Sequence, residues 1–186
     1  MLRLAKPPPG LLRRVLEDQR SQPLSYPEVG ATAGTLPPGY HHDRFQTDLG
    51  PDDGGRFERA GRAILDWVPQ RGAGIGVFPD VPVQPDMTMV LTIRLPVAGW
   101  AVAPARVVYV LDEPARAGFA YGTLPAHPER GEEAFLVTRG AGRVVFQVIA
   151  FSQPSLLLAR LGAPVARAFQ VRTITSYLRA MEDAVG

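Results

Sequence analysis

The sequence contains no cysteine, only three histidines and, among its 20 basic residues, a single lysine, Lys6. Without cysteine the chain can form no disulfide framework, and it offers neither a thiolate metal ligand nor a cysteine nucleophile. The lack of cysteine also agrees with a cytoplasmic location. These absences exclude several classes of catalytic and metal site.

Long apolar runs are missing as well. The first ten residues lack the apolar core of a signal peptide, and polar residues and Pro154 interrupt the least charged long stretch, residues 144–159. We therefore expect no membrane span. The net charge is only +2, and the arginines are interleaved with acidic residues, so we expect no nucleic-acid partner. The abundance of Ala, Gly, Pro and Arg is typical of a bacterium with a GC-rich genome.

The first part of the chain is predicted to be helical and then irregular. A length of 186 residues with 46% hydrophobic residues predicts one domain, residues 1–186. Residues 10–22 have a helical apolar period and follow three prolines, so residues 1–25 are interpreted as an N-terminal helical extension. Residues 26–39, rich in Gly and Pro, predict a loop across the surface or over a cavity mouth.

The middle of the chain has the apolar period of strands. A strand at residues 40–49 and a helical segment at residues 56–69 come first, and then the period changes from 3.6 to 2. One run of alternating residues is expected to face the interior: Met87, Met89, Leu91, Ile93 and Leu95. Further strand-like runs follow at intervals of roughly ten residues, and their short turn signals favour hairpins. The pattern predicts an antiparallel sheet of about six to seven strands.

The last part of the chain, residues 154–186, is predicted to form a long helix. Its apolar positions trace one stripe: Leu157, Leu161, Val165, Phe169, Val171, Ile174, Leu178 and Met181. Gly162 and Pro164 predict a kink. A sheet with one apolar face must cover that face, and this helix is long enough to do so. The predicted class is α+β, with a curved sheet wrapped around the C-terminal helix.

This order of elements resembles the helix-grip fold of the birch-pollen-allergen, START-domain and aromatic-polyketide-cyclase superfamily. The resemblance implies a curved sheet that grips the C-terminal helix, with a hydrophobic cavity between the two. A closer resemblance rests on YGTLPAHPERGEEAF at residues 121–135, with YPEVGAT at 26–32, LPPGY at 36–40, RVVYVLDEP at 106–114 and SYLRAM at 176–181. These segments resemble the bacterial and plant family catalogued as domain of unknown function nineteen-ninety, which implies an architecture and leaves the activity open.

The segment of residues 121–135 supplies the candidate acid–base residues. Tyr121 can donate a proton or a hydrogen bond to a ligand, or can simply be a packed tyrosine. His127, between two prolines, can act as a general base or can bond a neighbouring backbone group in the turn. Glu132 and Glu133 must point to opposite faces of a strand, so only one can face a cavity. We take Glu133 as the candidate catalytic residue, with an ion pair to an arginine as the alternative.

Four further residues are candidate ligand contacts: Arg106, Thr123, Tyr109 and Phe169. Arg106 could hold an anionic group, and Thr123 could add a hydrogen bond. No residue pattern predicts a metal or cofactor site, because His41 and His42 must lie on opposite sides of a strand and no nucleotide-binding motif is present. We expect a module that binds a small hydrophobic or aromatic molecule. The alternatives are a cofactor-independent cyclase or isomerase that uses Tyr121, His127 and Glu133, or a partner-binding protein.

Overall fold

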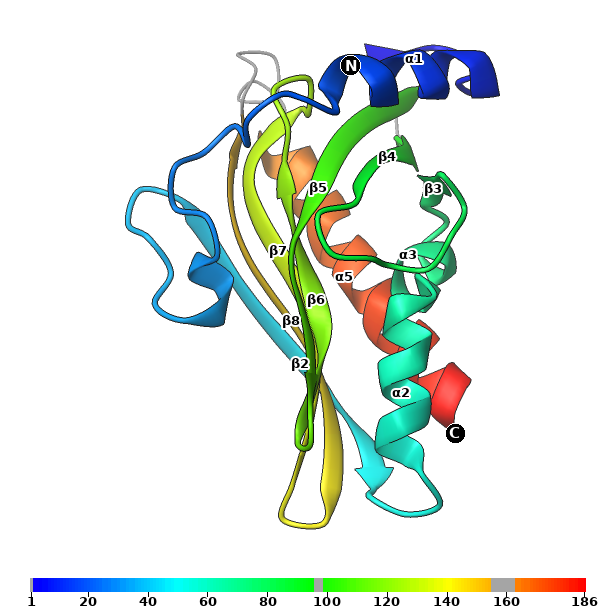
Figure 1. Cartoon of the computed structure of the whole chain (residues 1–186), viewed down its shortest axis with the longest axis vertical. Helices are drawn as coiled ribbons and strands as arrows, with labels where there is room; N and C mark the ends of the chain where they lie inside the picture. The colour runs from blue at the N-terminus through cyan, green and yellow to red at the C-terminus, as the bar shows by residue number, and fades with distance from the viewer. Residues whose placement is uncertain (1, 96–98, 155–162) are drawn as a thin grey trace.

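The computed structural model describes residues 2–95, 99–154 and 163–186, without the side chains of residues 154, 163–167 and 169. Figure 1 shows a tall, curved sheet with helices on both of its faces. The elements in chain order are β1 (Leu2–Arg3), α1 (Pro9–Gln19), η1 (Ala31–Ala33), β2 (His41–Pro51), α2 (Arg56–Leu65), α3 (Val68–Gly72), β3 (Gly76–Phe78), β4 (Thr88–Arg94), β5 (Trp100–Glu113), β6 (Arg116–Thr123), β7 (Glu129–Gly140), β8 (Arg143–Pro154) and α5 (Ala163–Val185).

The sheet is antiparallel throughout its described strands. Its order is β2-β8-β7-β6-β5-β4-β3, and the short β1 pairs with β5 to make eight strands. Strands β5 to β8 follow one another as hairpins, which the short turn signals favour. The first long strand, β2, pairs with the last, β8, so the two ends of the chain's strand region meet at one side of the sheet. This pairing brings residues far apart in sequence onto one surface.

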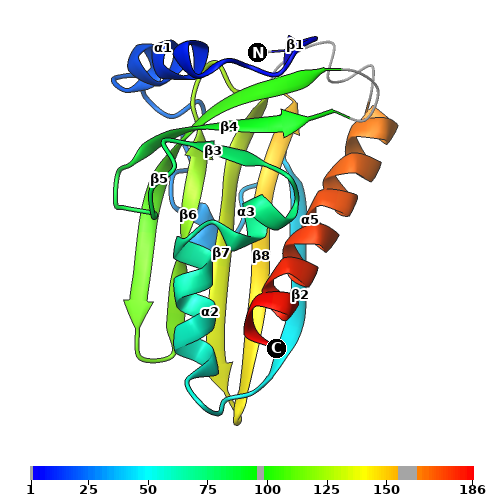
Figure 2. The ribbon, with the colours of Figure 1, turned by 90° about the vertical axis from the view of Figure 1, so that its right-hand side faces the viewer.

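The concave face of the sheet carries the main hydrophobic core. Helices α2, α3 and α5 lie over this face, as Figure 2 shows. Met89 and Leu91 of β4 are buried in this core, and so are Ile174 and Met181 of α5. The match between a strand period of two and a helix period of 3.6 explains why these residues meet. Met87 and Ile93 pack against the same core, so the expected inward direction is confirmed for Met87, Met89, Leu91 and Ile93.

The convex face is covered by different segments. Helix α1 packs Val15 against Val90 of β4 and Val102 of β5. The loop of residues 24–40 lies across β6, β7 and β8, where Tyr26 and Leu36 join a second hydrophobic cluster. The sheet is therefore covered on both faces, and alternate residues of each central strand enter two different cores.

The predicted α+β fold, with its curved antiparallel sheet and its N-terminal and C-terminal helices, is confirmed. Two predicted boundaries were wrong. Pro154 is the last residue of β8, and the C-terminal helix is described only from Ala163. The helical segment at residues 56–69 is interrupted at Trp67, whose φ of 61° is incompatible with a continuous helix, and α3 follows. The stripe positions 157 and 161 and the expected kink residue Gly162 lie outside the described residues.

Candidate functional site

Polar side chains interrupt the apolar concave face along one row that crosses four strands. The strand register places Asp43 of β2 opposite Ala150 of β8, and Ala150 opposite Glu133 of β7. Glu133 in turn lies opposite Tyr121 of β6. Directly paired residues point to the same face of a sheet. The register therefore gathers two carboxyl groups and a phenol on the concave face, with a small alanine between the two acids.

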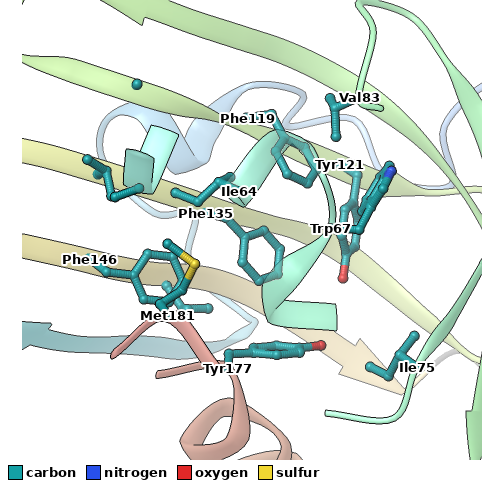
Figure 3. Packing of buried hydrophobic residues seen from close by; sticks show 14 of the residues in the cluster. Ile64, Trp67, Ile75, Val83, Phe119, Tyr121, Phe135, Phe146, Tyr177 and Met181 are labelled. Carbon is teal, nitrogen blue, oxygen red and sulfur yellow. The ribbon is translucent and has the colours of Figure 1, made fainter. Parts of the chain in front are cut away.

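Tyr121 and Glu133 are joined directly at the centre of this row. The Tyr121 hydroxyl donates a hydrogen bond of 2.5 Å to Glu133 Oε2. Tyr177 of α5 brings a second phenol, which is hydrogen-bonded to Tyr121. Figure 3 shows the two hydroxyl groups pointing into the space between Trp67 and Ile75. We call Tyr121, Glu133 and Tyr177 the concave-face network.

Aromatic packing holds this network in place. The ring centroid of Tyr121 lies 5.7 Å from that of Phe135, and Tyr177 meets Phe135 edge-on at 5.2 Å. Tyr121 is only 6% exposed and Tyr177 only 3%. Glu133 is half-buried, and the two phenols beside it are enclosed. Packed rings of this kind fix the directions of the hydroxyl groups.

The electrostatic setting of the network favours protonated groups. Burial raises the pKa of Glu133 to about 7; the hydrogen bond from Tyr121 lowers it, and the negative charges of Glu129 and Asp43 add to the increase. Burial is also the largest cause of the pKa of Tyr121 lying well above its ordinary value, followed by the charge of Glu133. Among the described residues, the charges that act on Glu133 are acidic. Glu133 can therefore gain or lose a proton near neutral pH.

Helix α5 also contacts the acidic end of the row. Asp43 is 2% exposed, and the side-chain amide of Gln170 donates a hydrogen bond of 3.0 Å to Asp43 Oδ2. Burial and the charge of Asp43 raise the pKa of Glu129, the first residue of β7. The concave face thus carries hydroxyl donors, one amide and three carboxyl groups at one end of an otherwise apolar core. Such a set can form hydrogen bonds to a ligand or move a proton.

His127 occupies the turn between β6 and β7. Its Nδ1 accepts a hydrogen bond of 2.9 Å from the backbone N–H of Glu129. Burial lowers the pKa of His127 to about 4, so the imidazole is neutral at pH 7. The ring bonds the backbone of Glu129, two residues further on, which is the turn-histidine alternative that the sequence left open. Tyr177, and not His127, is the third residue that meets Tyr121 and Glu133.

The neighbouring Glu132 points to the convex face and has a different environment. Its Oε2 accepts hydrogen bonds from the Tyr26 hydroxyl at 2.6 Å and from the Gly30 N–H at 2.7 Å. Its Oε1 accepts from the Thr32 N–H at 3.0 Å and from the Thr32 hydroxyl at 2.5 Å. We call these contacts the convex-face lock. Glu132 therefore fixes the loop of residues 24–40 to the sheet.

The remaining candidate residues do not join the concave-face network. Arg106 lies on the convex side, where its guanidinium donates a hydrogen bond of 2.7 Å to the backbone carbonyl of Arg20, just after α1. The Tyr109 hydroxyl is 2.8 Å from Thr32 Oγ1. A bulge between Val107 and Tyr109 breaks the alternation of β5, which explains why Tyr109 faces the convex side.

Thr123 and Phe169 complete the set of predicted ligand contacts. Thr123 is buried, and its hydroxyl accepts a hydrogen bond of 3.0 Å from the Gly131 N–H and lies 2.6 Å from Ser25 Oγ. This hydroxyl therefore ties β6 to β7 and to the start of the loop of residues 24–40. The side chain of Phe169 lies outside the described part of the structure.

Sequence reasoning missed Tyr177 and Asp43. Tyr177 lies between Ile174 and Met181 at helical spacing, so its position on the inner stripe of α5 was a usable signal. Asp43 had no such signal, because only the pairing of β2 with β8 places it near Glu133. In the described ranges, no group of three or more His, Cys, Asp or Glu is arranged to hold a metal ion. None of the described helices is both long and apolar enough to cross a membrane.

Sequence relatives cover between 60% and 100% of this chain. A UPF0548 protein of Deinococcus radiodurans is 33% identical over 202 residues and covers 100% of both chains. A UPF0548 protein of Dictyostelium discoideum is 28% identical and covers 97% of this chain and 94% of its own. A relative in Arabidopsis thaliana, UPF0548 protein At2g17695, is 30% identical over 118 residues. The relatives are therefore not confined to bacteria.

Solved structures with the same fold are distant in sequence. The hypothetical protein jhp0584 of Helicobacter pylori matches with a TM-score of 0.58 at 11% identity, covering 88% of this chain and 96% of its own. Human STARD10 matches with a TM-score of 0.52 at 11% identity, covering 95% and 80%. Ara h 8.0201 gives 0.51 at 11%, covering 79% and 98%. These likenesses show the helix-grip fold. A family model matches residues 25–180, so the chain belongs to the family described as "Domain of unknown function (DUF1990)".

Proposed function

We propose that this protein binds a small, largely apolar molecule between the concave face of the sheet and α5. The observation that carries the proposal is the concave-face network, which presents two phenols and a carboxyl group inside an apolar core. Small-molecule sites typically combine apolar walls with a few polar groups that fix the ligand's orientation. The likeness to the START and birch-pollen-allergen folds supports the proposal by analogy of fold.

The setting of Glu133 supports the same proposal. A buried acid with acidic neighbours destabilises the fold, and a bound ligand would offset part of that cost. Glu133 is half-buried beside two enclosed phenols. A ligand placed there would form hydrogen bonds to Tyr121 and Glu133. A cytoplasmic location remains a prediction from the sequence.

Two matched tyrosine variants test the proposal. The fluorescent probe N-phenyl-1-naphthylamine is apolar and carries one N–H donor, so it should bind and brighten. Tyr121→Phe removes only a hydroxyl of the network and should weaken binding by about 0.5 to 1.5 kcal/mol. Tyr109→Phe removes a hydroxyl from the convex side and is the control. A probe that fails to bind, or that responds equally to both variants, would contradict the proposal.

A second function is favoured by the closeness of Tyr121 and Glu133. Both groups converge on the inside, as a cyclase or isomerase requires, and a carboxylate with a pKa of about 7 is suited to general-base catalysis. In this alternative Glu133 is the base, Tyr121 the acid and Tyr177 the orienting group. Elimination of 5-nitrobenzisoxazole, which needs a base to remove one C–H proton, tests it. The rate of the wild-type protein should rise as pH passes 7, and the reaction should be lost in Glu133→Gln. Equal rates for the wild-type protein and this variant would contradict the alternative.

A further inference from the structure

Gln70 of α3 has a fully buried side-chain amide that forms no hydrogen bond with the described part of the chain. It is 0% exposed, and neither its amide nitrogen nor its amide oxygen has a hydrogen-bond partner among the described residues. Leaving such a group unpaired is costly, because it gives up its hydrogen bonds to water without replacement. Most buried polar groups in proteins are paired, so an orphan amide calls for a missing partner.

The position of Gln70 relates it to the concave-face network. It lies three residues after Trp67, the residue that precedes α3 and whose ring meets Phe119 of β6 edge-on at 5.0 Å. Phe119 and Tyr121 are alternate residues of β6 and share the concave face. Helix α3 packs against α5, which carries Tyr177. Gln70 therefore belongs to the layer of helices that faces the network.

The chain after α3 leads to the same region. The backbone N–H of Ile75 donates a hydrogen bond of 2.9 Å to the Gln70 carbonyl. Figure 3 shows Ile75 on the side toward which the Tyr177 hydroxyl points. Trp67 and Ile75 thus flank the space into which the two phenols point, and α3 runs between these two residues in the chain.

We propose that Gln70 binds the polar edge of the ligand, and that the ligand is an uncharged, largely apolar molecule with a neighbouring hydrogen-bond donor and acceptor. This inference rests on the proposed ligand-binding function. A primary amide offers one acceptor and two donors, so a carboxamide, lactam or similar edge matches it with two hydrogen bonds. The three carboxyl groups, Asp43, Glu129 and Glu133, disfavour an anionic ligand on the same side of the sheet.

Three probes that share one ring system test this ligand class. Naphthalene has no polar edge, 2-naphthamide has both a donor and an acceptor, and 2-naphthoate has a negative charge. Each competes with N-phenyl-1-naphthylamine at pH 8, and the change in fluorescence gives its affinity. We expect 2-naphthamide to bind about tenfold more tightly than naphthalene, and 2-naphthoate to bind most weakly. Tightest binding by 2-naphthoate would overturn the inferred ligand class.

Gln70→Met assigns the preference to the residue. Methionine has a similar volume and no strong hydrogen-bonding group, so the tenfold preference for 2-naphthamide should disappear while naphthalene binds as before. Gln46→Met, on the exposed side of edge strand β2, is the control and should keep the preference. If N-phenyl-1-naphthylamine binds and Gln70→Met keeps the preference, the inference about Gln70 is wrong while the proposed function stands. If the probe does not bind the wild-type protein, the proposed function itself fails.

A stability measurement provides a readout that needs no ligand. Protein refolded from denaturant carries no bound molecule, so the Gln70 amide should then lack a partner. Replacing it with an apolar group should raise the melting temperature by a few degrees. A clear fall in the melting temperature would show that the empty protein already satisfies the amide, and would overturn the inference.

Discussion

Glu132 and Glu133 are adjacent in β7, and their side chains point to opposite faces of the sheet. Glu132 enters the convex-face lock and accepts four hydrogen bonds from Tyr26, Gly30 and Thr32. Glu133 enters the concave-face network, accepts one hydrogen bond from Tyr121, and has a pKa raised to about 7. The difference separates two uses of a carboxyl group. A fully satisfied carboxylate holds a loop, and a weakly satisfied one is available to a ligand or a proton.

The largest effect that separates the two halves is expected from conservative glutamine variants. Glu132→Gln removes the charge that its four donors stabilise and puts an NH2 group among them, so it should lower the unfolding free energy by about 2 to 4 kcal/mol. Glu133→Gln should stay within about 1 kcal/mol of the wild type at pH 7. Urea unfolding measures both. Equal losses from the two variants would contradict the division between lock and network.

A glycine opposite the lock sharpens the structural side of the comparison. A Cβ atom at Gly122 would lie 2.1 Å from the Tyr26 hydroxyl, so Gly122→Ala must push Tyr26 away from Glu132. We expect a loss of about 2 to 3 kcal/mol in the unfolding free energy. Gly140→Ala is the matched control, because a Cβ there meets no atom within 4 Å. If Gly122→Ala leaves the unfolding free energy unchanged, the contact between Tyr26 and Glu132 does not stabilise the fold.

The pH dependence of stability tests the network side. Burial raises the pKa of Glu133 from 4.5 to about 7, so the folded state binds more protons than the unfolded state between these values. Stability from this group is therefore full below pH 4.5 and is lost as pH rises toward and past 7. Allowing for partial solvent access, we expect roughly 1 to 2 kcal/mol. Relative to the wild type, Glu133→Gln should become more stable from pH 5 to pH 8.

His127 acts in the opposite direction and must be separated from Glu133. Burial lowers its pKa from 6.5 to about 4, so the stability it supports is lost as pH falls through this range. Subtracting the unfolding free energy of the wild type from that of Glu133→Gln at each pH cancels the contribution of His127, because both proteins keep this residue. A difference that is flat between pH 5 and pH 8 would show that Glu133 titrates normally.

Sequence patterns predicted the fold better than the site. The apolar periods of two and 3.6 residues were sufficient to predict the main strands and helices in chain order, because each element buries one face and so sets its own period. The pairing of Tyr121 with Glu133 was also within reach, since a hairpin aligns residues of one motif. Asp43 and Tyr177 come from β2 and α5, and only tertiary packing brings them to that hairpin.

The candidate residues that lie outside the concave-face network show which features the sequence patterns do not reveal. Tyr109 shares the parity of Val107, but a bulge turns it to the convex face, and nothing in the local sequence marks that bulge. Arg106 was a reasonable anion-binding residue, yet it binds backbone carbonyls at the end of α1, a contact that depends on how this helix docks. His127 lies between two prolines, and the turn uses its imidazole for a local hydrogen bond.

The most direct test observes the two glutamates in one spectrum. In protein with 13C-labelled glutamate carboxyl groups, Glu132→Gln and Glu133→Gln assign the two signals. Binding of N-phenyl-1-naphthylamine should exclude solvent from Glu133 and so raise its apparent pKa above 7, while the Glu132 signal stays unchanged. This result would place the ligand on the concave face. A probe that shifts the Glu132 signal and leaves that of Glu133 in place would contradict the account.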